Sequence, residues 1–231
     1  MRLIFVRHGE PDYTNDCLTE NGKLQAQCTA KRLESEPIRA IFSSPMGRAM
    51  ETASFTAEQK ELPVTPLPFM HEIDWGTAAG AEEVPYKGHP WTLGYRLLTE
   101  HPEYVGSDQW MDHPYFRDNR CLAEYRKVAE GVDTFLAGYG LERTGKLYTC
   151  RRNCEDTIAL FAHGGSGAVL FSHLLNLPFP FVLTSLPYGV CSISVFALCP
   201  EQSDLVIPRL EIFNDMGHLG SVRQEKLHFE K

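Results

Sequence analysis

The sequence predicts an α/β fold, a three-layer α/β/α sandwich around a mostly parallel central sheet with an inserted cap segment at about residues 77–120. Strand-like and helix-like segments alternate through the first sixty residues and again near the carboxyl end, which is typical of a sheet covered by helices. The chain has 231 residues, 43% of them hydrophobic, and this is enough to bury one full core. We therefore expect a single domain over residues 1–231.

The first predicted strand is the apolar run from Leu3 to Val6, which ends at Arg7. Thr19 is a favoured N-cap residue, and the helix expected after it carries small and apolar residues at helical spacing, namely Ala26, Ala30 and Leu33. Pro37 should end this helix, because proline cannot continue a helix interior. A second strand is expected over residues 38–42.

A second helix is expected to begin at Ser44 and Pro45. Serine is favoured at the N-cap and proline at the first helical position. Arg48 then lies in the first turn of the helix. One apolar stripe should face the sheet, formed by Met46, Ala49, Met50 and Ala53.

Between Gly76 and Arg120 the periodicity fades, while proline, histidine, tryptophan, tyrosine and arginine accumulate. This composition favours an active-site cap over a core layer, and substrate specificity is expected to reside there. Several cap side chains are candidates for contacting remote groups of a substrate, with a solvated charged face as the alternative for most of them: Arg96, Arg117, Arg120, His89 and His113.

A regular pattern returns after the cap. A helical stripe is formed by Leu122, Tyr125, Ala129, Val132 and Leu136. Strands are expected over residues 147–150 and 157–162, joined by the polar turn at 151–153, and a helix follows in which Val169, Leu170, His173 and Leu174 recur. Two late strands, 190–198 and 205–213, are expected to pair as a hairpin.

Charge and composition exclude several classes of function. The net charge is 22 − 30 = −8, which argues against a protein that tracks a nucleic-acid backbone with lysine and arginine. The four apolar residues before Arg7 are too few for a signal peptide, and the apolar stretch from Gly189 to Cys199 is too short to span a bilayer. We expect a cytoplasmic protein with neither a nucleic-acid nor a membrane partner, and nothing in the sequence indicates its oligomeric state. The seven cysteines, including Cys150 and Cys154, are expected to be scattered reduced thiols.

The first strand ends in Arg7-His8-Gly9-Glu10, which sets an imidazole beside a permanent positive charge. A histidine attacks phosphorus through a neutral ring nitrogen, and the transferring group needs fixed positive donors around its oxygens. Arg48 lies at the start of one predicted helix, and His163-Gly164-Gly165 closes another predicted strand. In an α/β sheet such places converge on one crevice, so the pattern predicts an anion site.

With these motifs the chain resembles the histidine phosphatase superfamily, in its phosphoglycerate mutase-like branch 1. The resemblance covers both ends of the chain and misses most of the middle. Its further elements are Ser43 to Ala49 with Glu51-Thr52-Ala53, Ala162 to Gly165, Leu18 to Gly22 with Gln25-Ala26, and Phe213-Asn214-Asp215 with His218-Leu219.

The resemblance implies that His8 attacks phosphorus and becomes a phosphohistidine. Arg7 and Arg48 would clamp the phosphoryl oxygens through planar guanidinium groups that lysine does not reproduce. His163 would supply another donor, and Gly164 would bring the start of a helix to the anion. Structural capping is the alternative role for His163.

Glu72 is the candidate acid that protonates the departing oxygen. The segment His71-Glu72-Ile73-Asp74-Trp75-Gly76 resembles the family's acid-bearing segment. Burial near Trp75, or the charge of the phosphate, is expected to raise the pKa of this carboxyl group so that it holds a proton. Asp74 is close enough in sequence to be the acid instead, and a solvated surface glutamate is the other alternative.

Together these features predict metal-independent hydrolysis of a small-molecule phosphomonoester, with no metal or other cofactor. Mutase-type phosphoryl transfer is the first alternative, although the residues after the histidine motif, Pro11 to Asn15, depart from those of phosphoglycerate mutases. A serine hydrolase using Ser166, Asp215 and His218 is a remote alternative, because Gly164 to Ala168 nearly matches a nucleophile elbow. A phospho-ligand binding protein without turnover is the non-enzymatic alternative.

Overall fold

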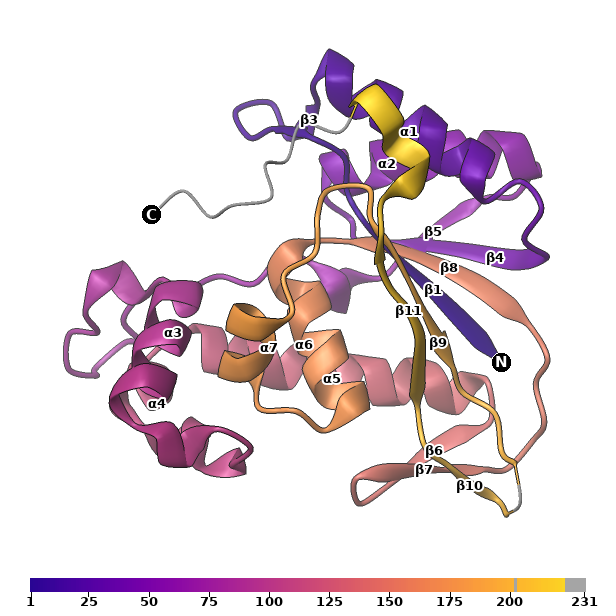
Figure 1. The fold of residues 1–231 in the computed structure, drawn as a ribbon. Helices are drawn as coiled ribbons and strands as arrows, with labels where there is room; N and C mark the ends of the chain where they lie inside the picture. The colour runs from indigo at the N-terminus through magenta and orange to yellow at the C-terminus, as the bar shows by residue number, and fades with distance from the viewer. Residues whose placement is uncertain (202, 223–231) are drawn as a thin grey trace.

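A computed structural model describes residues 1–201 and 203–222 of the chain. Its centre is a six-stranded sheet in the order β11-β9-β1-β8-β4-β5 (Figure 1). The pairs β1 with β8, β8 with β4, and β4 with β5 are parallel. On the other side of β1, β9 is antiparallel to β1, and β11 is antiparallel to β9. The strands are β1 (Arg2–Arg7), β4 (Ile38–Ser43), β5 (Val64–Pro66), β8 (Thr157–Ala162), β9 (Ile193–Ala197) and β11 (Arg209–Asp215). The predicted mostly parallel sheet is confirmed.

Helices cover both faces of this sheet. In Figure 1, α1 (Glu20–Arg32) and α2 (Gly47–Lys60) lie on one side, and α5 (Cys121–Gly138) and α6 (Gly164–Leu175) lie on the other. Along β1, Leu3 and Phe5 pack in the core under α5 and α6, whereas Ile4 and Val6 pack in the core under α1 and α2. Strands buried on both faces are typical of a sheet between two helical layers. The three-layer α/β/α prediction is confirmed.

The first helix has the cap that the sequence predicts. Thr19 is the N-cap residue, and its hydroxyl oxygen accepts a hydrogen bond of 3.0 Å from the backbone N–H of Gly22. The helix ends at Arg32, with Leu33 as its C-cap.

The predicted start of α2 is wrong. The helix begins at Gly47, and Met46, which has extended backbone angles, is its N-cap residue without a side-chain bond. The carboxylate of Asp16 accepts the Gly47 N–H at 2.7 Å instead, from the turn between the short strands β2 (Pro11–Asp12) and β3 (Cys17–Leu18). The carboxylate of Asp16, from a loop distant in sequence, therefore caps the helix in place of Ser44. Arg48 lies in the first helical turn as expected.

The segment 77–120 is more regular than its sequence indicates. It contains the helix α3 (Pro90–Glu100), where Pro90 takes the first position and His89 is the N-cap residue. Leu93 and Leu97 are fully buried, and α3 packs against α7 (Phe179–Ser185). The segment also holds α4 (Pro114–Arg117) and the short 3-10 helices η2 (Tyr86–Gly88), η3 (Pro102–Tyr104) and η4 (Asp108–Asp112); elsewhere lie η1 (Pro68–Met70) and η5 (Gly217–Val222).

Two of the later predictions divide between two sheets. The strands at 147–150 and 157–162 both form, but β7 (Leu147–Cys150) pairs with β6 (Leu141–Thr144) in a separate three-stranded sheet. The late hairpin is confirmed as the antiparallel pair of β9 and β11. The predicted second strand of this hairpin, 205–213, is divided, because Leu205–Val206 forms the separate strand β10, which pairs with β7.

Two expectations from composition can be compared with the described residues. Six of the cysteines are free thiols, namely Cys17, Cys28, Cys121, Cys150, Cys154 and Cys199. Within residues 1–201 and 203–222, no single helix has the length and apolarity to cross a membrane, and the pair α6 and α7, bent by 119°, meets those criteria by length and composition only.

Candidate active site

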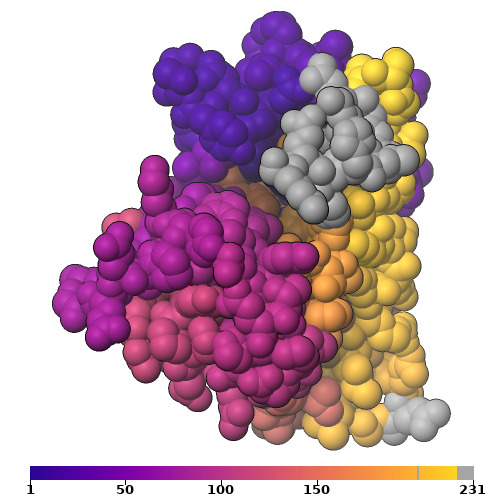
Figure 2. Space-filling view, turned by 60° about the vertical axis from the view of Figure 1, so that its left-hand side comes forward, coloured from indigo at the N-terminus to yellow at the C-terminus, as the bar shows by residue number. Residues whose placement is uncertain are grey.

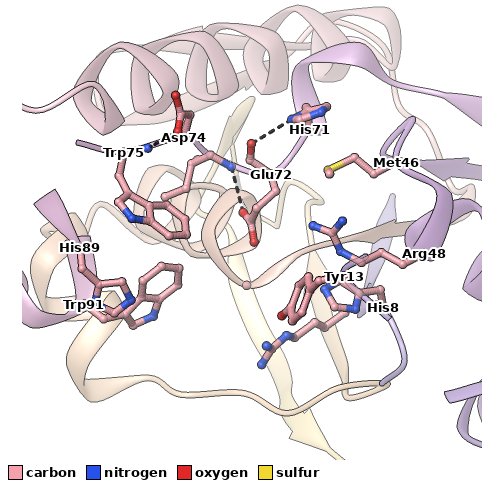
Figure 3. Close-up of a pocket in the computed structure, with 13 residues that line it drawn as sticks. His8, Tyr13, Met46, Arg48, His71, Glu72, Asp74, Trp75, His89 and Trp91 are labelled. Atoms are coloured by element: carbon pink, nitrogen blue, oxygen red, sulfur yellow. Dashed lines mark hydrogen bonds between the residues drawn. The ribbon is translucent and has the colours of Figure 1, made fainter. Parts of the chain in front are cut away.

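A cavity of about 670 Å³ opens at the carboxyl ends of the parallel strands (Figure 3). Arg7 ends β1 and His8 follows it directly, whereas Arg48 begins the helix after β4 and Gly164 begins the helix after β8. These residues and Glu72 all line the cavity, because the carboxyl ends of parallel strands meet at one edge of the sheet. The structure thus brings five of the predicted site residues to one space.

His8 is buried and held in one orientation. Its Nδ1 lies 2.7 Å from the carbonyl oxygen of Gly9, and since a carbonyl only accepts, Nδ1 carries the hydrogen and Nε2 carries the lone pair. Burial lowers the pKa of His8 to about 3, and the positive charges of Arg7 and Arg48 act in the same direction. At neutral pH the ring is therefore neutral, with a nucleophilic nitrogen.

His163 lies beside His8, with their ring centroids 5.1 Å apart. It is fully buried as the N-cap residue of α6, and its Nε2 lies 2.7 Å from the hydroxyl oxygen of Ser44. Burial lowers the pKa of His163, and the neighbouring His8 and Arg48 lower it further. Its Nδ1 has no hydrogen-bond partner among the described residues.

Both arginines are anchored at one end of the guanidinium group. Arg7 donates from Nη1 to the carbonyl oxygen of Tyr188 at 2.7 Å, and Arg48 donates from Nη1 to the carboxylate of Asp16 at 2.5 Å. The Nε atoms of both side chains are buried and, like Nδ1 of His163, have no partner in the described part of the chain. Buried polar atoms normally have partners, so these nitrogens suit an anion that accepts several hydrogen bonds.

Glu72 lies in the middle of the cavity, on the side that faces His8 and Arg48 (Figure 3). Its carboxylate accepts N–H bonds from Gly165 at 3.1 Å and Ser166 at 2.9 Å, at the start of α6, and from Ile73 at 2.9 Å. Only glycine fits at position 165, because a Cβ atom there would lie 2.4 Å from Ile73 and 2.6 Å from the carboxylate. These contacts fix the carboxylate in the cavity that Arg7, His8 and Arg48 also line.

Asp74 also lines the cavity but lies farther from His8 than Glu72 does, beside Trp75 (Figure 3). Its carboxylate accepts the Trp75 N–H at 2.8 Å and lies 3.4 Å from Nε of Arg120. The geometry therefore favours Glu72 over Asp74 as the carboxyl group nearest to the histidines.

Comparison with known proteins agrees with this arrangement. The family model of the histidine phosphatase superfamily (branch 1) matches residues 3–209. The chain belongs to this superfamily.

Two curated relatives of the superfamily are similar in sequence. Phosphoserine phosphatase 1 of Hydrogenobacter thermophilus is 33% identical over 141 residues, a match that spans 55% of this chain and 65% of that protein. A probable phosphatase of Schizosaccharomyces pombe is 25% identical over 239 residues, which is 98% of this chain and 99% of that protein.

The fold is shared with solved members of the superfamily. A phosphoserine phosphatase from Entamoeba histolytica, in complex with phosphoserine, superposes with a TM-score of 0.62 at 21% identity. The match covers 94% of this chain and 98% of that one. It extends the likeness through the middle of the chain, where the sequence motifs are sparse.

Five side chains of residues 77–120 were candidates for contacting remote groups of a substrate, and of these only His89 lines the cavity. Arg96 pairs with Glu100 and Arg117 pairs with Asp118, whereas Arg120 pairs with Asp74, which itself lines the cavity. His113 instead caps α4, with its Nδ1 accepting the Tyr115 N–H at 3.3 Å. Arg96 and Arg117 therefore match the alternative of a solvated charged face.

The serine hydrolase alternative is wrong, because Ser166 has its contacts away from Asp215 and His218. Ser166 is fully buried, and its hydroxyl donates to the carbonyl oxygen of Met70 at 3.2 Å. His218 lies 3.1 Å from the hydroxyl oxygen of Thr29 on α1, and Asp215 pairs with Arg32 at 3.5 Å. Ser166 therefore anchors the segment that carries Glu72.

Two residues that position the site side chains were not predicted from the sequence. Asp16 positions Arg48 and caps α2 at once. Tyr188 is buried, accepts from Arg7 through its carbonyl, and donates its hydroxyl to the carbonyl of Gly164 at 2.6 Å. Both belong to no local pattern, because they act on elements that are remote in the sequence. Among residues 1–201 and 203–222, no three His, Cys, Asp or Glu side chains are grouped to hold a metal ion.

The buried neutral state of His8 should make stability depend on pH. Its pKa is about 3 in the folded protein and has the ordinary histidine value of 6.5 in the unfolded chain, so below pH 6.5 the unfolded chain binds a proton that the folded chain does not. This contribution to stability is complete above pH 6.5 and is lost as the pH falls towards 3, at about 1.4 kcal/mol per pH unit in the middle of that window. We expect the free energy of unfolding, measured with urea at pH 7, 6 and 5, to fall less steeply with decreasing pH for His8→Asn than for wild type. Equal slopes would contradict a neutral His8.

Proposed function

We propose that this protein is a metal-independent phosphatase that hydrolyses a small-molecule phosphomonoester through a phosphohistidine on His8. The observation that supports this most is the pairing of a neutral, oriented His8 with three buried nitrogens, on Arg7, Arg48 and His163, that have no hydrogen-bond partner among the described residues. A dense set of cations and hydrogen-bond donors can stabilise phosphoryl transfer without a metal.

In the first step, the lone pair on Nε2 of His8 forms a bond to phosphorus while the bond from phosphorus to the ester oxygen breaks. Arg7, Arg48 and His163 hold the non-bridging oxygens, and Gly164 places the positive end of the α6 dipole beside them. The ring keeps its hydrogen on Nδ1, so the carbonyl of Gly9 faces the positive charge that develops there. Glu72 gives its proton to the departing oxygen, and the negative charge of the bound phosphate favours that protonated form.

In the second step, water attacks the phosphohistidine and the bond between nitrogen and phosphorus breaks. Glu72, now a carboxylate, takes the proton from the water, which restores the acid for the next cycle. The N–H groups of Ile73, Gly165 and Ser166 hold its oxygens in place through both steps. Inorganic phosphate then leaves, with His8 neutral again.

We further propose that residues 77–120 form a cap on the one domain of residues 1–231. In the space-filling view, the magenta surface of this segment lies below the indigo surface of the N-terminal residues (Figure 2). His89 and Trp91 contribute to the cavity wall from this segment. The cap is thus placed to contact the part of a substrate beyond its phosphate.

Hydrolysis is tested by incubating the purified protein, with and without a chelator, with a panel of phosphomonoesters that includes 3-phosphoglycerate. We expect release of inorganic phosphate that the chelator does not reduce. Conversion of 3-phosphoglycerate to its 2-phospho isomer without net phosphate release would favour the mutase alternative. Binding of phosphate without turnover of any ester would favour the non-enzymatic one.

A further inference from the structure

The side of the cavity away from His8 is built from three aromatic rings, Trp75, His89 and Trp91, which we call the aromatic wall. The two indole rings are 6.0 Å apart at 83°, and His89 lies 5.3 Å from Trp91 and 5.7 Å from Trp75. Figure 3 shows His89 and Trp91 across the cavity from Arg48 and His8. All three rings are only partly buried, so they present faces and edges to the cavity.

The aromatic wall is poor in charge. Of the described residues that line the cavity, only Arg7 and Arg48 carry a permanent positive charge, and both lie at the phosphate end. His89 accepts the Thr92 N–H through Nδ1, and burial lowers its pKa, so its ring is neutral. The cation at the aromatic wall is Arg120, whose guanidinium donates to the carbonyl oxygen of Trp75 and faces the carboxylate of Asp74, so a carboxylate on the substrate would find it already paired.

A positively charged group would find the carboxylate beside the aromatic wall already paired. Asp74 is the anion beside the aromatic wall, and its carboxylate already faces Arg120 at 3.4 Å. The remaining attraction is that of ring faces and edges. Two indoles at 83° form a corner in which a flat ring can stack on one and meet the other edge to face.

The size of the cavity fits such a group. At about 670 Å³ it exceeds what a phosphate alone needs and lies within the usual range for small-molecule sites. Resting on the proposed function, we propose that the aromatic wall selects phosphomonoesters whose alcohol part carries an uncharged aromatic ring. Trp75 and Trp91 are then specificity residues, and Glu72 protonates the alcohol oxygen between the ring and the phosphorus.

The test compares esters of primary alcohols, whose leaving groups differ little in reactivity. We expect kcat/KM for benzyl phosphate to exceed that for phosphoserine and phosphocholine by at least about tenfold, and that for cyclohexylmethyl phosphate by about threefold, as an aromatic contact would give. Phosphoserine or phosphocholine as the best substrate would overturn the proposal, as would equal rates for the flat and the puckered ring.

Variants of Trp91 locate the effect. Trp91→Ala should lower kcat/KM for benzyl phosphate by about tenfold more than for methyl phosphate, and Trp91→Phe should restore most of the difference. The control is Tyr95→Ala, on the exposed side of the same helix, which should change neither rate. Equal losses for benzyl and methyl phosphate in Trp91→Ala would show a structural role and contradict the proposal.

Binding of unreactive analogues separates this inference from the proposed function. Benzylphosphonate should bind the wild-type protein at least about tenfold more tightly than methylphosphonate in calorimetry, and Trp91→Ala should remove most of that difference. Equal affinities would overturn the inference even if esters are hydrolysed. Absence of hydrolysis with every ester, with this binding preference intact, would contradict only the proposed function.

Discussion

Replacement of His8 by alanine is expected to lower kcat for every phosphomonoester by at least about 1000-fold, because it removes the nucleophile that forms the covalent intermediate. His163, the only other imidazole in contact with the His8 ring among the described residues, is tied through Nε2 to Ser44. Its Nδ1 is buried at the anion end and is oriented as a donor in the proposed mechanism. Steady-state release of inorganic phosphate measures the loss.

The same variant should give no acid-labile, alkali-stable phosphate on the protein after a rapid quench with labelled substrate. His101→Ala is the matched control, since that histidine is exposed in the 77–120 segment and does not line the cavity. It should leave turnover and labelling unchanged. Undiminished labelling of His8→Ala, mapped to His163 or to any other residue, would contradict the assignment of the nucleophile.

The second large effect is expected for Glu72→Gln. An amide cannot give up a proton to the leaving group, and proton transfer of this kind contributes about 100- to 10,000-fold to rate. For benzyl phosphate, whose alkoxide is a poor leaving group, we expect a loss of that size in kcat. For 4-nitrophenyl phosphate, whose 4-nitrophenolate leaving group departs without a proton, the loss should be much smaller. The ratio of the two losses is the measured quantity.

Asp74→Asn is the control for this experiment, because Asp74 lines the same cavity but lies beside Trp75, farther from His8 than Glu72 does. It should affect both substrates equally and far less than Glu72→Gln does. Equal slowing of the good and the poor leaving group by Glu72→Gln would rule out its role as the acid. A leaving-group-dependent loss in Asp74→Asn would transfer that role to Asp74.

The elements that the sequence predicted correctly are those whose signals are local. The apolar run before Arg7 is buried on both faces as β1, and Thr19 caps α1 through its own hydroxyl. Both signals lie within a few neighbouring residues of the sequence. The convergence of Arg7, Arg48 and His163 was also predictable, since it depends only on parallel strands ending at one edge of a sheet.

The errors arise where a distant part of the chain replaces a local partner. Asp16, more than thirty residues away in sequence, caps α2 in place of Ser44, and Ser44 is thereby available to bind His163. The cap was expected to be irregular, yet α3 forms there because His89 and Pro90 start it and its apolar face packs on α7. The aromatic wall depends on that helix, so Trp91 could not be recognised as a cavity residue from spacing alone.

A crystal structure of the protein with vanadate would test most directly whether four side chains distant in sequence meet around one oxyanion. The account predicts vanadium bonded to Nε2 of His8, with its oxygens contacted by Arg7, Arg48 and Nδ1 of His163, and Glu72 nearest to the oxygen opposite His8. Vanadate bound elsewhere, or bound in this cavity without a bond to His8, would contradict it.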